Sequence, residues 1–369
     1  FDHGRALHDR GQADLGLMIQ YENGIRLILA TYGSVFPRAL PHALISGLIA
    51  LLVSLFAHKE LNESFDHPYA HQVFALSVSI VLVFRANLSY QRFWDGVTQI
   101  QIMSARWAEC ATQVYCFERC TYPESDLVEG ETFCQNLVHL FTLMHAVALQ
   151  ELREDMDMGH FCQTITEEHR DVQELTGNHP VLPVYGELQS DEAEMLEDAE
   201  DRVYAVMTWI THDWVVRKKQ GGIRVPEPVL SRAFQSLSDG HQAFMQAKKI
   251  QETPFPYPYA QLVTMLLAIN AVTAPLMVAA YVDDTLLAVS LSFIATIVSV
   301  SLDEVAKEIE DPYGFDANDL PLSNLHEEYL ARIVQVMEQV IPLRLVDPEL
   351  SPDPAAREHP SWQATQVVQ

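Results

Sequence analysis

The residues from 73 to 96 constrain the fold of this chain more than any other stretch. Val73 to Phe84 carries no charge, but Arg85 and Arg92 follow within two helical turns. A lipid-facing span needs about 20 apolar residues, and an arginine at the membrane edge is costly unless it faces protein or water. The stretch therefore predicts a helix that lines a hydrated path, with its apolar half as the narrow section. A buried core helix with a polar tail is the alternative interpretation.

Three apolar residues in this stretch share one face of the expected helix. Leu76, Ile80 and Phe84 are four residues apart, and this spacing stacks their side chains along one side. Repeated around the axis of a symmetric oligomer, the shared face would form three apolar rings.

Three further apolar segments are long enough to cross a bilayer: 36–57, 262–282 and 285–302. Asp283 and Asp284 join the last two as a hairpin, and the stretch from residue 73 forms another hairpin with the first. Both polar regions then fall on the same side of the membrane. The pattern predicts an all-α membrane protein with four transmembrane helices and a helical soluble domain.

The polar regions set the expected domain organisation. It consists of a polar segment (1–35), spans one and two (36–98), a soluble helical domain (99–252), a proline-rich segment with spans three and four (253–303), a stalk and returning helix (304–342) and an extended tail (343–369). Alternate prolines are expected to exclude a helix from Thr253–Ala260, because proline fixes φ and forces the preceding residue to be extended. Pro275 is expected to kink the third span.

Composition excludes several classes of function. The 369 residues carry a net charge of −27, concentrated at 151–201, which argues against a nucleic-acid partner. Five cysteines without a Cys-x-x-Cys pair predict buried free thiols rather than disulfides or a zinc site. The chain has no hydrolase, P-loop or zinc-protease motif, so neither an enzyme nor a required cofactor is expected. No signal peptide is visible at the start.

Three motifs, in this order, resemble segments of the bestrophin family. They are NLSYQRFWDG (Asn87–Gly96), TPFPYPYAQL (Thr253–Leu262) and EIEDPYGFDANDLPL (Glu308–Leu322). Order, spacing and span pattern agree from Pro37 to Pro342, and the chain is most similar to the plant, algal and bacterial branch. The resemblance implies a mostly helical, bestrophin-like homopentamer in a lipid bilayer, with four transmembrane helices per subunit and one central anion pore.

The resemblance also assigns roles to individual residues. It places the pore neck at the three residues that share one helix face, Leu76, Ile80 and Phe84, which we call the neck residues. It places a second constriction, the aperture, at Phe255, where an aliphatic residue is usual in the family. An apolar neck suits weakly hydrated anions and can gate by dewetting, and the positive edge of an aromatic ring would help an anion pass.

Two arginines and two aspartates remain open to more than one interpretation. Arg85 and Arg92 would attract anions if either faces the pore, or would form a salt bridge to a neighbouring helix. Asp316 and Asp319 match calcium ligands of animal family members, and Ca²⁺ takes six to eight oxygens. Their acidic run is interrupted here at 317–318, and Asp319 could instead cap the following helix.

The sequence therefore predicts a channel for monovalent inorganic anions, namely chloride, with bicarbonate and nitrate as further candidates. A cation-selective pore or carrier of the same fold is one alternative, because the acidic surface would concentrate cations at the vestibule. A non-conducting membrane scaffold is another. Similarity to plant-type members favours a thylakoid or other organellar membrane, with the plasma membrane as the alternative.

Overall fold

The computed structural model describes residues 33–64, 67–121, 127–161, 181–186 and 188–338. Every regular element within these ranges is a helix, which confirms the predicted all-α fold class. The expected segments 1–32 and 343–369 lie outside the described residues, so the structure says nothing of them.

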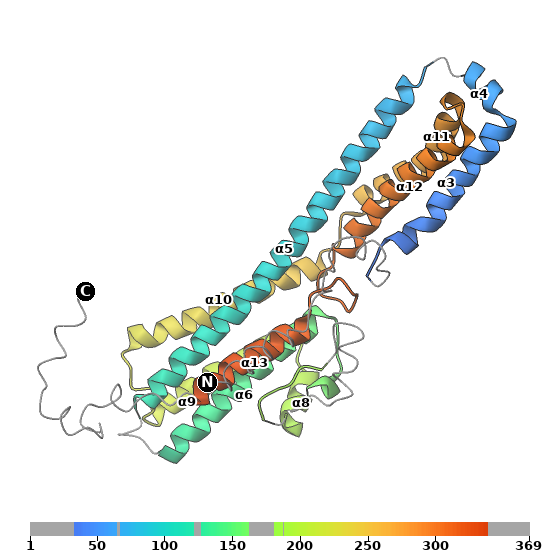
Figure 1. Ribbon diagram of the computed structural model, residues 1–369. Helices are drawn as coiled ribbons and strands as arrows, with labels where there is room; N and C mark the ends of the chain where they lie inside the picture. The colour runs from blue at the N-terminus through green and yellow to red at the C-terminus, as the bar shows by residue number, and fades with distance from the viewer. Residues whose placement is uncertain (1–32, 65–66, 122–126, 162–180, 187, 339–369) are drawn as a thin grey trace, which may run out of the picture.

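The molecule is elongated, and one helix runs through its whole length (Figure 1). This helix, α5 (Tyr69–Arg119), has 51 residues, which corresponds to about 75 Å at 1.5 Å per residue. Its N-terminal half lies beside α11 (Tyr257–Tyr281) and α12 (Thr285–Glu308), and these two helices pack in turn against α3 (Phe36–Phe56). The short helix α4 (His58–Ser64) follows α3 at the far end of this membrane part.

The C-terminal half of α5 belongs to a second group of helices, which forms the soluble part (Figure 1). The group contains α6 (Leu127–Leu152), α8 (Ser190–Glu197), α9 (Arg202–Lys219), α10 (Glu227–Glu252) and α13 (Leu322–Glu338), with a short 3₁₀ turn at Met158–His160. The change from apolar to polar composition near residue 98 therefore does not interrupt the helix. A helix continues through such a change because its backbone hydrogen bonds do not depend on side-chain polarity.

The share of each apolar helix that is buried within the chain distinguishes α6 from the helices that can face lipid. Five described helices are long and apolar enough to cross a membrane. In α3, α5, α11 and α12, only 22–28% of the apolar window is buried within the chain, whereas in α6 the figure is 78%. Since α6 hides its apolar side chains among protein neighbours, it needs no lipid, and we assign the four predicted spans to the other helices.

The soluble part has a large core around α6. Its largest fully buried side chains include Trp107, Trp214 and Phe141. Close packing of α10 on α5 depends on Gly240, because a Cβ atom at that position would lie 2.3 Å from Trp107 Cδ1. The indole Nε1 of Trp107 donates a hydrogen bond of 3.3 Å to the carbonyl of Leu237 on the same helix as Gly240.

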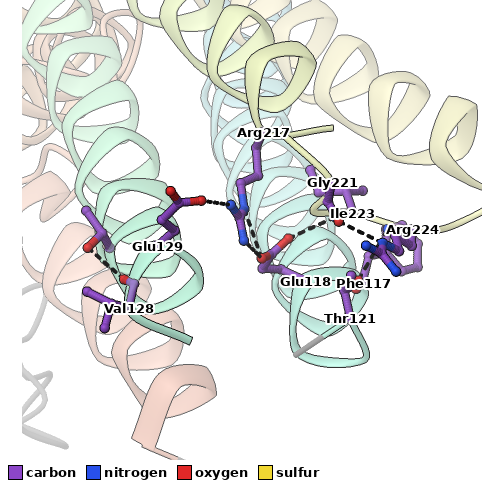
Figure 2. Close-up of polar contacts among 10 residues, drawn as sticks. Phe117, Glu118, Thr121, Val128, Glu129, Arg217, Gly221, Ile223 and Arg224 are labelled. Atoms are coloured by element: carbon purple, nitrogen blue, oxygen red, sulfur yellow. Dashed lines mark hydrogen bonds and ion pairs between the residues drawn. The ribbon is translucent and has the colours of Figure 1, made fainter. Parts of the chain in front are cut away.

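A buried ion pair fixes the end of α5 inside this core (Figure 2). Glu118 and Arg217 are almost fully buried, and Glu118 Oε1 accepts hydrogen bonds from Arg217 Nη2 at 2.6 Å and Nε at 3.0 Å. The second oxygen accepts from the backbone N–H of Ile223 at 2.9 Å, and Arg217 Nη1 also reaches Glu129 at 3.1 Å. The pair therefore joins α5, α6, α9 and the turn after α9.

The structure corrects two local predictions. The segment Thr253–Ala260 is not entirely non-helical, because α11 begins at Tyr257 with Pro258 in its first turn. Proline is tolerated there, since the first turn has no intrahelical partner for its missing N–H. The cysteines described are free, but only Cys110 and Cys134 are buried, and Cys120 is exposed. Cys162 lies outside the described residues.

Candidate functional site

The three neck residues lie on the side of α5 that the chain's other helices leave uncovered. The exposed fractions of Leu76, Ile80 and Phe84 are 61%, 49% and 60%. The opposite side of the same helix is covered, and its Val78 and Leu82 form a small apolar cluster with residues of α11. An uncovered apolar face is what the spacing of the three residues predicts for a surface shared with other copies or with a pore.

This uncovered side continues along most of α5, and its chemistry changes below Phe84. Exposed residues recur three or four apart, the spacing of one helix face: Val73, Leu76, Ile80, Phe84, Asn87, Gln91, Trp94, Thr98, Ile102, Ala105 and Glu109. We call this set the α5 stripe. It is wholly apolar to Phe84 and mixed beyond it, where Asn87 and Gln91 are the first polar residues, so an apolar section is followed by a more polar one.

Arg85, the next residue after Phe84, points away from the α5 stripe into the protein. Its side chain is 3% exposed. Nη1 is 2.5 Å from Asp303 Oδ1 on α12, and Nη2 is 3.3 Å from Glu310 Oε2 in the loop that follows. This is the second of the two interpretations given above: Arg85 forms an interhelical salt bridge, and the expectation that it attracts pore anions is wrong for this chain, since its charge is paired and buried.

Arg92, two turns further along α5, is bound to backbone carbonyls. Nε donates to the carbonyl of Glu310 at 2.6 Å, Nη1 donates to that of Thr253 at 2.5 Å, and Nη2 donates to that of Ile250. It therefore holds the end of α10 and the loop after α12 against α5. All three guanidinium nitrogens therefore contact neutral carbonyls and no carboxylate, and the attraction of anions by the Arg92 charge stays a prediction.

Two of the three sequence motifs meet at Gly96 of α5. A Cβ atom at Gly96 would lie 2.9 Å from both Pro312 Cγ and Tyr313 Oη, which leaves no room for any other residue without movement. Tyr313 is fully buried, and burial raises the pKa of its hydroxyl. The motif around Arg92 and the Asp-Pro-Tyr-Gly motif after α12 are therefore two sides of one packed contact.

Phe255, the predicted aperture residue, lies in the short connection between α10 and α11. It is half-buried, and its ring contacts Tyr259 edge-on with 5.5 Å between centroids. The guanidinium carbon of Arg85 lies 5.3 Å from the Phe255 ring centroid. The aperture role itself stays a prediction, since one chain does not form the pore axis.

Asp316 and Asp319 lie together in the loop before α13, and calcium binding there stays a prediction. Asp319 Oδ2 accepts a hydrogen bond of 2.7 Å from the backbone N–H of Asp316, so this carboxylate caps its own loop. Burial, opposed by that hydrogen bond, raises the pKa of Asp319 to about 7. Within the described ranges no three acidic, histidine or cysteine side chains gather as a metal site, whereas Ca²⁺ needs six to eight oxygens.

Three functional contacts escaped the sequence reasoning: Asp303, Glu310 and Lys307. Asp303 is 3% exposed, and its Oδ2 also pairs with Lys307 Nζ at 2.8 Å. The sequence does contain a signal for Asp303. This acid lies at the end of the apolar segment 285–302, and Arg85 lies at the end of the apolar part of 73–84, so the two opposite charges could have been paired.

Comparison with known proteins agrees with this architecture. The sequence model of the family "Bacterial/Fungal Bestrophin protein" matches residues 18–335. A voltage-dependent anion channel-forming protein of Synechocystis is 21% identical over 319 residues, which cover 85% of this chain and 91% of that protein. A protein of the same description from Salmonella typhi is 20% identical, with 82% and 87% covered.

Solved structures show the same fold. A crystal structure of a bacterial bestrophin homologue from Klebsiella pneumoniae matches with a TM-score of 0.65. The match covers 82% of this chain and all of that chain, at 14% sequence identity. A second crystal structure of that homologue matches with a TM-score of 0.64 over 81% of this chain.

Proposed function

This chain belongs to the bacterial and fungal bestrophin family, and from that premise we propose that it is a homopentameric channel for monovalent anions. The observation that carries the proposal is the α5 stripe. Four long apolar helices make the chain an integral membrane protein, and the neck residues are left exposed by every other described helix of the same chain. Around a fivefold axis they would form three apolar rings.

The chemistry of the α5 stripe favours anions. The neck residues carry no carboxylate, and an apolar constriction passes weakly hydrated ions most readily because they lose water at the lowest cost. Phe84 would present a positive ring edge to an anion. Past the neck, Asn87 and Gln91 offer amide N–H donors on the same face. The relatives whose names describe anion channel formation support the same ion class.

The arginines contribute to the pore indirectly in this proposal. Arg85 holds α5 against α12, and Arg92 holds it against the end of α10, the connection that contains Phe255, and the loop after α12. Chloride is the proposed main ion, and bicarbonate and nitrate are further candidates. The proposal includes no required metal, and calcium at Asp316 and Asp319 stays a prediction from the resemblance. Placement in a thylakoid or other organellar membrane, or in the plasma membrane, stays a prediction from the resemblance.

Reversal potentials of the purified protein in planar bilayers test the proposal. Under a KCl gradient we expect a shift towards the chloride potential. Phe84→Ala should raise conductance and change the permeability ratio of thiocyanate to chloride. Ile45→Ala, which removes an equally exposed apolar side chain on α3, is the matched control and should change neither.

Two results would contradict the anion channel. A shift towards the potassium potential would show a cation-selective pore of the same fold. Absence of current from intact oligomers of both the original protein and Phe84→Ala would favour a scaffold, because removing the bulkiest neck side chain should open a closed apolar constriction.

A further inference from the structure

One buried guanidinium contacts the elements that carry both proposed constrictions. Arg85 follows the neck residue Phe84 in α5, and its guanidinium carbon lies 5.3 Å from the ring centre of Phe255, the proposed aperture residue. Its nitrogens contact Asp303 of α12 at 2.5 Å and Glu310 of the following loop at 3.3 Å. Neck helix, aperture segment and α12 therefore meet at a single side chain.

The surrounding charges hold Arg85 in this position. Asp303 is as buried as Arg85, and Lys307 pairs with its second oxygen at 2.8 Å. Lys307 also pairs with Glu304 at 2.7 Å, and Arg85 pairs with Glu310, so two cations and three acids meet at the junction. A buried ion pair such as Arg85–Asp303 contributes no more to stability than apolar side chains of the same volume would. Its role is therefore better explained by the geometry of the arginine side chain.

Arginine supplies a geometry that no apolar side chain has. Its guanidinium is planar, with N–H groups directed outward in the plane and two faces free to lie on an aromatic ring. Here the edge is bound to carboxylates, so the plane has a fixed orientation, and the guanidinium carbon lies over the Phe255 ring. Phe84 is the residue before Arg85, about 100° away around the axis of α5, so a movement of α5 displaces both constrictions.

We propose that Arg85 is a positioning residue that holds Phe255 in a fixed relation to the neck, so that the two constrictions select ions as one unit. The inference rests on the proposed function, because it uses Phe84 and Phe255 as parts of the pore. Its specific content is that the effect of Phe255 on selectivity depends on Arg85.

The test is a double-mutant comparison of permeability ratios. Thiocyanate and chloride are placed on opposite sides of a planar bilayer, and the reversal potential gives their permeability ratio for the original protein, Arg85→Gln, Phe255→Leu and the double variant. We expect each single variant to change the ratio in the same direction, by on the order of threefold. The double variant should differ little from either single variant.

Arg38→Gln is the matched control. Arg38 forms an ion pair with Glu308 near the same end of α12, but it is more than half exposed and contacts neither Phe84 nor Phe255 in the described chain. Its loss should leave the ratio unchanged. Arg85→Lys keeps the charge beside Asp303 but lacks the planar face, so it should fold and still shift the ratio towards that of Phe255→Leu.

The outcomes separate the inference from the proposed function. Anion-selective current from the original protein supports the proposed function independently of every variant. If that current is present, an additive double variant, an unchanged ratio in Arg85→Lys, or an equal shift in Arg38→Gln would overturn the positioning role of Arg85. Should Arg85→Gln fail to assemble, Arg85→Lys alone decides between the same outcomes.

Discussion

Acidification should destabilise the soluble part of the protein through a pair of buried histidines. His145 of α6 and His326 of α13 are fully buried, with 2.9 Å between their Nδ1 atoms. His326 Nε2 lies 2.7 Å from the carbonyl oxygen of Pro183, and His145 Nε2 lies 2.8 Å from Ser104 Oγ. The carbonyl can only accept, so His326 carries its proton on Nε2 and its Nδ1 accepts from His145. Ser104 has one hydroxyl proton, and its Oγ lies 2.8 Å from His145 Nε2 and 2.9 Å from the carbonyl oxygen of Ile100, so either of these two atoms can accept that proton.

A further proton on either histidine is opposed chiefly by burial of the charged ring. Burial lowers the pKa of His326 to about 4, with Arg153 lowering it further and the Pro183 carbonyl and Glu327 opposing. Burial also lowers the pKa of His145 well below its usual value, as do the neighbouring His326 and Arg332. Tyr329 and Trp107, which pack on His145, are neutral.

The size of the effect follows from proton linkage. The folded pKa lies below the unfolded one, so the unfolded state binds more protons and stability falls as the pH decreases from about 6.5 to about 4. For His326 alone, the free energy of unfolding should fall by about 2 kcal/mol between pH 7 and pH 5 and by about 3 kcal/mol in the limit. His145 adds a loss of the same sign.

The assay compares unfolding curves of three proteins in detergent at constant ionic strength. Tryptophan fluorescence reports the core, which contains Trp107 and Trp214. His326→Gln keeps a donor for the Pro183 carbonyl but cannot take up the proton, so between pH 7 and pH 5 it should lose about 2 kcal/mol less than the original protein. His212→Gln, at an exposed site of the same domain, should follow the original protein. Parallel pH curves for the original protein and His326→Gln would refute the reasoning.

Two substitutions test the packing that joins the sequence motifs and fixes the end of α5. Gly96→Ala should cost about 1–3 kcal/mol of stability, because the added methyl would lie 2.9 Å from Tyr313 Oη; a thermal unfolding curve that matches the original would show that the contact relaxes freely. Glu118→Gln should lower the free energy of unfolding by about 3–5 kcal/mol, because it removes the negative charge that pairs with the buried Arg217. Urea unfolding measures this loss, and Glu109→Gln, at an exposed pair with Arg106, should stay within about 1 kcal/mol of the original.

The neck face was predictable from the sequence, whereas the partners of the arginines were not. Spacing alone places Leu76, Ile80 and Phe84 on one side of a helix, and the structure leaves that side uncovered. Periodicity within one helix cannot say which distant helix packs against it. Asp303 is 218 residues from Arg85 in the chain, so only the folded arrangement decides between a pore-facing and a paired guanidinium.

Two local sequence rules gave wrong predictions because they ignored where in a helix a residue lies. Prolines exclude a helix from its interior but not from its first turn, and α11 begins at Tyr257 within the proline-rich segment. A change in polarity near residue 98 suggested a domain boundary, yet α5 continues to Arg119. Beyond this point α5 belongs to the soluble core, where Gly240 lets α10 pack closely against it.

The continuity of α5 also limits how the proposed pore can open. The helix contains no proline, while α3 and α11 contain Pro41 and Pro275. Its one glycine within the described span, Gly96, is held against Tyr313, so the usual sites of a hinge are absent. The neck therefore cannot widen by bending at a joint inside its own helix. It widens by a change of side-chain rotamer at the rings, or by a tilt of α5 that carries the buried Glu118–Arg217 pair at its far end with it.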